Sequence, residues 1–468
     1  MEAALLQALG EAVGKDNVLT SRDDLTAYGL DWTRFFDPDP AAIVMARDIE
    51  QLQRLVAFAN ENRVALVPSG GRTGLSGGAV AARHEVVVSF DKMNRIGDFD
   101  EADNLVVVEP GVVTANLQQF ALDHDRYYPV DFASSGSSQI GGNIATNAGG
   151  IKVLRYGLTR DRVAGLKVVT GTGELLDLNR GLVKNATGYD LRHLFIGSEG
   201  TLGLIVEASI ALTRQPRELS VLLLAVPDMR KIMTVLGAFR HSCELTAFEF
   251  FSDNALDQVM AHHGLPAPMD KRCAYYVLIE FERTRSDADE RAMAAFEECV
   301  EARIATDGVA SRSEQDRIDL WKYREYISES ITPRTPYKND VAVRVSQVPE
   351  FLAAIEGKVA ERYPEFEIVW FGHIGDGNLH LNILKPQGME TAGFKRQCET
   401  VSEEILAIVE RFGGSISAEH GVGLLKRDQL HFSRSESEIA AMRGIKRVFD
   451  PNGIMNPGKL LPSEGRKL

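Results

Sequence analysis

The stretch PSGGRTGLSGG, residues 68–78, constrains the fold more than any other, because it places five glycines in eleven positions directly after a strand-like run. Glycine tolerates positive φ and lets a ligand or another backbone approach closely. Successive exposed N–H groups then form a concave anion site, for which a pyrophosphate is the natural guest. A long surface turn is the alternative, but a second glycine-rich stretch at 135–150 follows a similar spacing of strands and favours the anion site.

A nicotinamide dinucleotide fold is the obvious competitor, because it also uses a glycine loop. That fold needs G-x-G-x-x-G at the opening of a helix and an acidic residue about twenty positions later. Gly70, Gly71 and Gly74 do not have that spacing, and the strand-like EVVVSF (85–90) follows with no clear helix between. The sequence therefore favours a different phosphate-binding architecture.

Length and charge limit the possible classes of protein. A chain of 468 residues predicts two or three domains, and its net charge of −14 argues against general binding to nucleic acid or anionic membranes. No window has the roughly eighteen apolar residues that a membrane span requires, and the start lacks the pattern of a signal peptide. The four cysteines (Cys243, Cys273, Cys299 and Cys398) lie far apart, which predicts free thiols in a reducing, cytoplasmic compartment.

The pattern of elements divides the chain into four segments. Residues 1–37 form a helical lead-in, and 38–216 combine strands with the glycine-rich loops. Residues 217–392 alternate strand-like and helical runs, which is typical of an α+β domain. Residues 393–468 are mostly helical.

Two histidines flank a turn in FGHIGDGNLHLNI (371–383). Apolar runs on both sides of a Gly/Asp/Asn cluster predict a strand, a turn and a second strand. Side chains alternate along a strand, so His380 and Asn382 share a face, and His373 can face His380 across the hairpin. Two neutral imidazoles suit a divalent metal. Polar residues on the solvated face of a sheet are an equally good interpretation of this stretch alone.

The stretch SAEHGVG (417–423) supplies a carboxylate and a third histidine. Glu419 and His420 are adjacent, so in an extended segment they point in opposite directions, one toward a metal and the other toward a substrate. With His373 and His380, Glu419 makes a set of two imidazoles and one carboxylate, a pattern typical of catalytic zinc or a similar ion. Taken alone, Glu419 and His420 read better as a helix-start carboxylate and a surface histidine.

Six motifs in order resemble those of the FAD-dependent 2-hydroxy-acid dehydrogenases of the vanillyl-alcohol oxidase flavoprotein superfamily: PSGGRTGLSGG, DFASSGSSQIGGNIATNAGG, HLFIGSEGTLGLI, GHIGDGNLHLN, SAEHGVG and FDPNGIMNPGK. The resemblance runs from about residue 38 to 461. It implies an α+β fold with a PCMH-type FAD-binding domain of two α+β lobes (38–216) and a substrate-binding cap domain with an antiparallel sheet (217–392). A C-terminal helical segment (393–468) returns to the flavin.

The resemblance also implies the FAD-binding residues. The pyrophosphate side comprises Pro68, Gly70, Gly71, Arg72, Thr73, Gly74 and Ser76. The other side of the flavin comprises Ser134, Gly136, Gly141, Gly142, Asn143, Thr146 and Gly149. Glu199, Gly200 and Ile205 lie near the adenosine and the ring system, and Asn456 closes the site. Some relatives attach FAD covalently through histidine, but His84, His124 and His193 lie outside these motifs, so we expect a non-covalent flavin.

The resemblance implies a mechanism for oxidation of a 2-hydroxy acid. A metal held by His373, His380 and Glu419, for which zinc is expected although manganese and cobalt also suit the ligands, lowers the pKa of the substrate hydroxyl. His420 removes the hydroxyl proton as general base, and the Cα hydrogen leaves as hydride to flavin N5. Asn382 hydrogen-bonds the substrate carboxylate or alkoxide.

Arg324, Ser328 and Lys338 match the substrate-binding residues of D-2-hydroxyglutarate dehydrogenases. Arg324 can hold one carboxylate, and Lys338 is a second cation that D-lactate relatives generally lack. The resemblance therefore implies D-2-hydroxyglutarate, or a near diacid such as D-malate. The chain departs from the family pattern at Arg344, where relatives often have proline, and at Gln347, where they have arginine; the effect of these changes on the pocket is open.

Several alternatives stay open. A D-lactate or glycolate dehydrogenase of the same family differs by one charge in one pocket. A sugar-acid or aldonolactone oxidase is disfavoured because those enzymes lack the HxxGDGNxH motif. A non-catalytic flavin or metal carrier is disfavoured by the adjacent His420, and a purely structural zinc site would need four ligands where three are found. The expected electron acceptor is an electron-transfer flavoprotein or a quinone, and the family suggests a homodimer.

Overall fold

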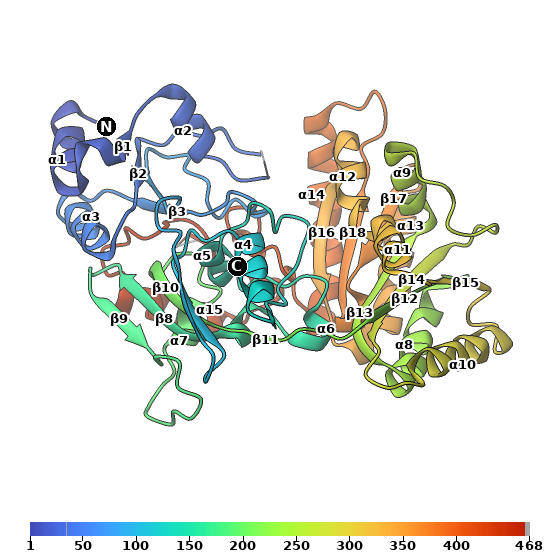
Figure 1. Cartoon of the computed structure of the whole chain (residues 1–468). Coiled ribbons are helices and arrows are strands. Elements are labelled where there is room, and N and C mark those ends of the chain that lie inside the picture. Colours follow the sequence, from blue (N-terminus) through green and yellow to red (C-terminus); the bar gives the residue numbers. More distant parts are fainter. Residues whose placement is uncertain (34, 464–468) are drawn as a thin grey trace. The chain divides into compact units, whose positions relative to one another are not determined.

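The computed structural model describes residues 1–33 and 35–463, which divide into two compact units (Figure 1). Unit 1 comprises Met1–Gly149, Gly157–Gln215 and Glu419–Leu468, and unit 2 comprises Gly150–Tyr156 and Pro216–Ala418. Both units combine helices with sheets, as the α+β prediction requires. The expected boundary at 216/217 falls where unit 2 begins its long segment, whereas the expected C-terminal segment 393–468 is divided between the two units at residue 419.

Unit 1 contains two main sheets and their covering helices. Its strands are β1 (Val18–Leu19), β2 (Ala42–Met45), β3 (Leu66–Ser69), β4 (Val86–Ser89), β5 (Ile96–Asp100), β6 (Leu105–Val108), β7 (Arg126–Tyr127), β8 (Val163–Thr170), β9 (Leu175–Leu178), β10 (Gly203–Ala211) and β11 (Thr213–Arg214). Its helices are α1 (Ala3–Val13), α2 (Arg22–Tyr28), α3 (Ile49–Asn62), α4 (Thr114–Asp123), α5 (Ile140–Thr146), α7 (Arg192–Phe195) and α15 (Glu436–Phe449).

The first sheet of unit 1 has the strand order β1-β2-β4-β3, in which β2, β4 and β3 are parallel. Helix α3 begins at Asp48, whose side chain accepts a hydrogen bond from the Gln51 backbone N–H at 2.7 Å, and its apolar residues recur at helical spacing. They pack with α1 against this sheet. No helix separates β3 from β4 in the described chain, so the connection consists of the glycine loop and its continuation, as predicted.

The second sheet is antiparallel, with the order β5-β6-β10-β8-β9, and its core includes residues of α4 and α5. The second glycine-rich stretch contains the short helix α5, which the sequence analysis treated as loop. The C-terminal segment returns to the first sheet, because the Leu66 backbone N–H donates to Ile454 and the Asn456 N–H donates to Leu66, both at 2.8 Å. This pairing places Asn456 beside the strand that leads into the first glycine loop.

Unit 2 contains one sheet, in which neighbouring strands are not always consecutive in the chain, and helices pack on it (Figure 1). Its strands are β12 (Leu219–Val226), β13 (Glu244–Ser252), β14 (Tyr275–Glu282), β15 (Asp307–Ala310), β16 (Tyr337–Ala342), β17 (Ile368–Gly372) and β18 (Asn378–Ile383). Its helices are α6 (Val153–Tyr156), α8 (Ile232–Ser242), α9 (Asp253–His263), α10 (Ala288–Glu301), α11 (Glu314–Glu325), α12 (Ile327–Ile331), α13 (Val348–Arg362) and α14 (Thr391–Arg411).

The seven strands of unit 2 follow the order β15-β12-β14-β13-β17-β18-β16, and every pair is antiparallel. Phe251 of β13 pairs with Phe371 of β17, which pairs in turn with His380 of β18. Paired residues project from the same face of a sheet. Phe251 and Phe371 share a hydrophobic core with residues of α9, α11 and α12, so His380 projects from the face that these helices cover.

The described helices were also compared with what a bilayer span requires. None of them, across residues 1–33 and 35–463, is both long enough and apolar enough to cross a membrane.

Candidate active site

Unit 1 contains a cleft formed by the glycine loops. The residues predicted to hold FAD that line it are Pro68, Gly70, Gly71, Arg72, Thr73, Gly74, Ser76, Gly141, Gly142, Asn143, Thr146, Glu199, Gly200 and Ile205. Ser134, Gly136, Gly149 and Asn456, also predicted, do not line it. The lining further includes Ser69, Gly78, Ala79, Phe90, Pro110, Gln139, Ala145 and Gly203, which the sequence analysis did not name.

The backbone of the glycine loops forms much of this cleft. A Cβ added to Gly71 would lie 2.1 Å from the Ser137 carbonyl oxygen, so this position requires glycine for close packing of the two loops. A Cβ added to Gly142 would meet nothing within 4 Å, so that glycine leaves open space. The two positions show that one set of glycines brings the loops together and another keeps the cleft clear.

The polar groups at the cleft fit a flavin dinucleotide. The Ser69 hydroxyl and the Gln139 side-chain oxygen are buried, and neither has a hydrogen-bond partner among the described residues. Buried polar groups are normally satisfied, so these two atoms indicate that a polar ligand completes the site. No histidine, cysteine or tyrosine is among the lining residues in the described chain.

Glu199 and Asn456 hold the loops around the cleft in place. Glu199 accepts hydrogen bonds from the backbone N–H groups of Val422 and Gly423 at 2.7 and 2.8 Å, and its burial raises the pKa of its carboxyl group. The Asn456 amide donates to the carbonyl oxygens of Gly78 and Glu199. Asn456 therefore joins the first glycine loop to the Glu199 segment from behind the cleft.

In unit 2, the predicted histidine hairpin is present with one difference. β17 and β18 form the two strands, but His373 lies just beyond β17 at the start of a 3₁₀ turn, and Phe371 is the residue that pairs with His380. The His373 and His380 rings nevertheless approach within 5.4 Å, centroid to centroid. The sequence analysis expected the two imidazoles to face each other across the two strands. The turn after β17 brings them together instead.

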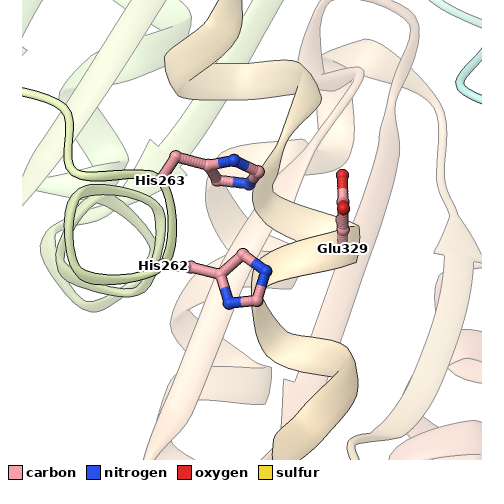
Figure 2. Close-up of side chains that lie close together, drawn as sticks. All are labelled: His262, His263 and Glu329. Carbon is pink, nitrogen blue, oxygen red and sulfur yellow. The ribbon is translucent and has the colours of Figure 1, made fainter.

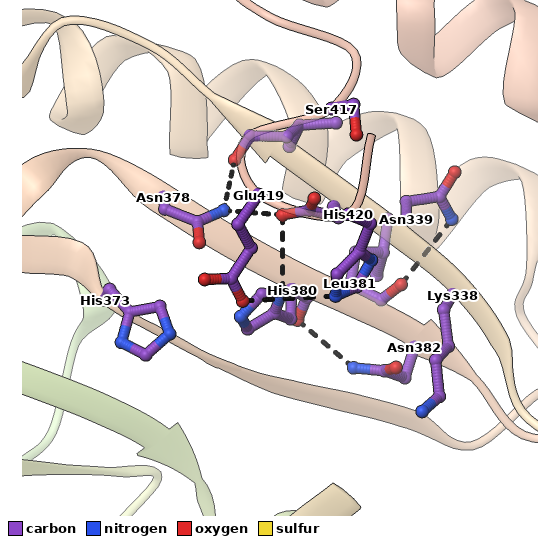
Figure 3. A network of polar contacts seen from close by, with 12 residues as sticks. Lys338, Asn339, His373, Asn378, His380, Leu381, Asn382, Ser417, Glu419 and His420 are labelled. Carbon is purple, nitrogen blue, oxygen red and sulfur yellow. Dashed lines mark hydrogen bonds and ion pairs between the residues drawn. The ribbon is translucent and has the colours of Figure 1, made fainter. Parts of the chain in front are cut away.

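A ladder of four polar residues runs across β16 and β18, and Figure 3 labels three of them, Lys338, His380 and Asn382. Lys338 pairs with Asn382, and Asp340 pairs with His380, so alternation places all four side chains on one face. The Lys338 ammonium donates to the Ser328 hydroxyl at 3.2 Å, and burial lowers the pKa of Lys338. Three of the predicted substrate-binding residues therefore lie together, beside a predicted metal ligand.

Glu249, a buried carboxylate that the sequence analysis missed, contacts both His373 and Arg324. One Glu249 oxygen lies 2.9 Å from His373 Nδ1, and the other lies 2.7 Å from the Arg324 guanidinium. Glu249 and Arg324 are both buried, and Arg324 also lies over the Phe371 ring. A lone glutamate inside the apolar strand run LTAFEFF was the available signal, because a buried charge requires a partner.

Each of the two histidines has a carboxylate beside its Nδ1 atom. Glu249 serves His373, and the Asp340 oxygen lies 3.5 Å from His380 Nδ1. A carboxylate on one ring nitrogen orients the imidazole and leaves Nε2 for a metal, which is the usual arrangement at protein metal centres. The donor set therefore fits a divalent cation.

The predicted carboxylate ligand follows unit 2 directly along the chain. Ser415 pairs with Ala342 next to β16, and the chain continues through Ala418 to Glu419. One ligand atom each of His373, His380 and Glu419 lies within 4.8 Å of the others (Figure 3). The three predicted ligands are thus brought together.

The expectation that Glu419 and His420 diverge is not met. The chain bends at residues 418–420, and His420 Nε2 lies 3.9 Å from Glu419 Oε1. The opposite directions expected for neighbours in an extended strand do not apply to a bend. Arg344, whose direction was left open, is exposed.

Comparisons with known proteins agree with this arrangement. Residues 40–179 match the family described as FAD binding domain, and residues 215–460 match FAD linked oxidases, C-terminal domain. The chain is 60% identical over 459 residues to the D-2-hydroxyglutarate dehydrogenase of Stutzerimonas stutzeri (strain A1501), covering 98% of this chain and 99% of the relative. It is 51% identical over 453 residues to the D-2-hydroxyglutarate dehydrogenase of Xanthomonas citri pv. viticola, covering 97% and 96%.

A solved structure of p-cresol methylhydroxylase with substrate bound superposes with a TM-score of 0.77 at 17% identity, covering 99% of this chain and 98% of that one, and shows the shared fold. Two family matches, near full-length relatives and a common fold all point the same way. The chain belongs to the FAD-linked oxidases and, within them, to the FAD-dependent D-2-hydroxyacid dehydrogenases.

Proposed function

We propose that this FAD-dependent dehydrogenase oxidises D-2-hydroxyglutarate, or a near diacid such as D-malate, to the 2-oxo acid with the aid of a divalent metal. The observation that carries the proposal is the ladder of Lys338, Asn382, Asp340 and His380, with Ser328 beside Lys338. It combines a half-buried cation, a neutral amide and a metal-ligating imidazole on one face of one sheet. That is the set of groups a hydroxylated dicarboxylate requires.

Two anchors are available for the two carboxylates. Lys338 has no carboxylate partner among the described residues, and its lowered pKa means that a substrate anion would stabilise its charged form. Arg324 is tied to Glu249, but its Nε–H is buried and unpartnered in the described chain. We assign the distal carboxylate to Lys338 and Ser328, and the carboxylate next to the reacting carbon to Arg324. Asn382 lies beside them, with its amide nitrogen donating to the carbonyl oxygens of Val369 and His380 at 3.2 and 3.4 Å.

His373, His380 and Glu419 would hold the metal, for which we propose zinc, and the unit 1 cleft would hold FAD non-covalently. When bound, the metal would supply a Lewis acid for the substrate hydroxyl, and FAD would supply the hydride acceptor. An imidazole nitrogen of His420 takes the proton of that hydroxyl as general base. Glu249 and Asp340 keep the two ligating imidazoles oriented and hold a proton on each Nδ1.

The remaining assignments follow the family. We propose an electron-transfer flavoprotein or a quinone as the electron acceptor, a homodimer as the active form, and the cytoplasm as the compartment. All four cysteines are free thiols in the structure, which supports a reducing compartment.

The substrate can be tested by mixing the purified flavoenzyme without oxygen with D-2-hydroxyglutarate, D-malate and D-lactate in turn. Bleaching of the flavin absorbance reports its reduction. We expect fast bleaching by a diacid and slow bleaching by D-lactate. Bleaching by D-lactate alone would mean that Lys338 does not serve a distal carboxylate, and it would favour a D-lactate or glycolate dehydrogenase. No bleaching by any of the three acids would contradict the proposal altogether.

A further inference from the structure

Three side chains of unit 2 outside the family motifs form a second group with metal-ligating atoms (Figure 2). They are His262 and His263, the last two residues of α9, and Glu329 of α12. One ligand atom from each lies within 4.8 Å of the others. Residues of α9 and α12 belong to the same hydrophobic core, so packing fixes the two helices beside each other.

His263 has a ring nitrogen that lacks a hydrogen-bond partner among the described residues. Its Nε2 atom is buried and makes no hydrogen bond with any described residue. One side of the ring packs on Tyr326 with centroids 4.3 Å apart, and the His262 ring meets it edge-on at 4.8 Å. A buried nitrogen without a partner is destabilising, so a ligand that reaches this nitrogen would be stabilising.

Charge at the site favours a cation. Glu329 is exposed, and among the described residues its carboxylate makes no hydrogen bond or ion pair. Helix α9 ends directly after the two histidines at Gly264, so its partial negative C-terminal charge lies at the same place. A carboxylate and a helix C-terminus both attract a positive ion, and the neutral imidazoles supply nitrogen donors.

We propose that His262, His263 and Glu329 form a second site for a divalent transition metal, for which zinc is the probe. Imidazole and carboxylate ligands suit zinc, copper or nickel better than magnesium or calcium, which prefer oxygen. Zinc holds nitrogen at about 2.0–2.1 Å, so tetrahedral ligand atoms lie roughly 3.3 Å apart. His262 and Glu329 are exposed and can rotate to close the present spacing, and water completes the coordination. The ion would link α9 to α12.

The test counts zinc on the full-length flavoenzyme after chelator treatment, by titration against a chromophoric chelator with the flavin still bound. We expect about two zinc ions per chain in the unaltered protein and about one in His262→Ala, His263→Ala or Glu329→Gln. Because His262 and Glu329 are exposed, their variants avoid the packing change at His263. The matched control is His241→Ala, an exposed histidine that also lies near the end of its helix, α8, and should keep about two.

The His380→Ala variant separates this site from the proposed active-site metal. It should also bind about one zinc ion, and added zinc should still raise its thermal midpoint, because an ion that binds only the folded state stabilises it. Combining His380→Ala with Glu329→Gln should remove that rise. Unchanged zinc binding in both His262→Ala and Glu329→Gln would overturn the second site. Unchanged binding in His380→Ala alone would count against the active-site metal and leave the second site standing.

Discussion

The two functional regions of the molecule differ in whether backbone or side-chain atoms form them. The cleft of unit 1 is made largely of backbone, mainly from three short stretches of sequence, 68–79, 139–146 and 199–205. The polar site of unit 2 is made of single side chains from β13, β16, β18, α11 and α12. The cleft should therefore be sensitive to added volume, and the polar site to the loss of one functional group at constant volume.

The largest expected effect comes from adding one methyl group to the cleft. Gly71→Ala places a Cβ 2.1 Å from the Ser137 carbonyl oxygen, so the loops must separate, at a cost of about 1–3 kcal/mol, and the flavin should be lost. Gly444→Ala on α15 is the matched control and should keep its flavin, because its Cβ meets no protein atom within 4 Å and Gly444 does not line the cleft. Flavin content after gel filtration measures both. A Gly71→Ala variant with full flavin content would contradict the claim that the cleft is sensitive to added volume.

Removing the proposed base should stop the chemistry and leave the cleft intact. For His420→Ala we expect a fall of about 10²–10⁴-fold in the rate of flavin reduction by D-2-hydroxyglutarate, which is the usual contribution of general acid–base catalysis. Flavin content should stay normal, because His420 does not line the cleft. Stopped-flow absorbance measures the rate, and reduction as fast as in the unaltered enzyme would show that another group takes the proton.

Changing one oxygen of Glu249 to nitrogen should weaken the proposed metal site. Because the carboxylate orients His373, we expect Glu249→Gln to lower the affinity of the active site for zinc by about 10–100-fold. The control is Glu280→Gln on β14, an equally buried carboxylate whose partners are Lys152, Arg317, Thr246 and Trp321.

Zinc titration of each variant in the His262→Ala background counts the active site alone. Equal affinities for zinc in the Glu249 and Glu280 variants would mean that Glu249 acts only as a structural charge.

Lys338 should distinguish diacids from monoacids. Lys338→Met removes a charge-assisted hydrogen bond worth about 1.5–3 kcal/mol, so KM for D-2-hydroxyglutarate should rise by about 10–100-fold. KM for D-lactate, which has no second carboxylate, should change little. Lys322→Met on α11 is the control, because that lysine pairs with Asp319 at the surface. Steady-state kinetics with both acids decides the matter, and equal increases would remove Lys338 from the distal pocket.

The pH dependence of binding should show the smallest effect. Burial lowers the pKa of Lys338, so in the free enzyme its ammonium loses the proton at a lower pH than an ordinary lysine does. The neutral amine cannot pair with a carboxylate, so KM for the diacid should rise as pH increases through that lowered pKa. Lys338→Arg should abolish the rise, because arginine stays charged. A KM profile unchanged by Lys338→Arg would assign the titration to another group.

The same contrast explains what the sequence could predict. The glycine loops and the histidine hairpin lie within short motifs, so local spacing identified them. The family resemblance that those motifs carry then implied most of the cleft lining. Glu249 lies more than a hundred residues from His373 and 75 residues from Arg324. The pairing of β13 with β17 brings Glu249 to His373, and the packing of α11 on β13 brings it to Arg324. The bend at Glu419 and His420 depends on how the chain leaves unit 2, which strand alternation does not describe.

The central claim is that a metal and the half-buried Lys338 make the flavin of this chain reducible by a D-2-hydroxy diacid. The most direct test compares chelator-stripped flavoenzyme with the same sample after zinc is restored, each mixed without oxygen with D-2-hydroxyglutarate. We predict flavin bleaching only after restoration, with the same response in His262→Ala, which lacks the proposed second site. Equally fast bleaching in the stripped enzyme, with zinc shown to be absent, would contradict the claim.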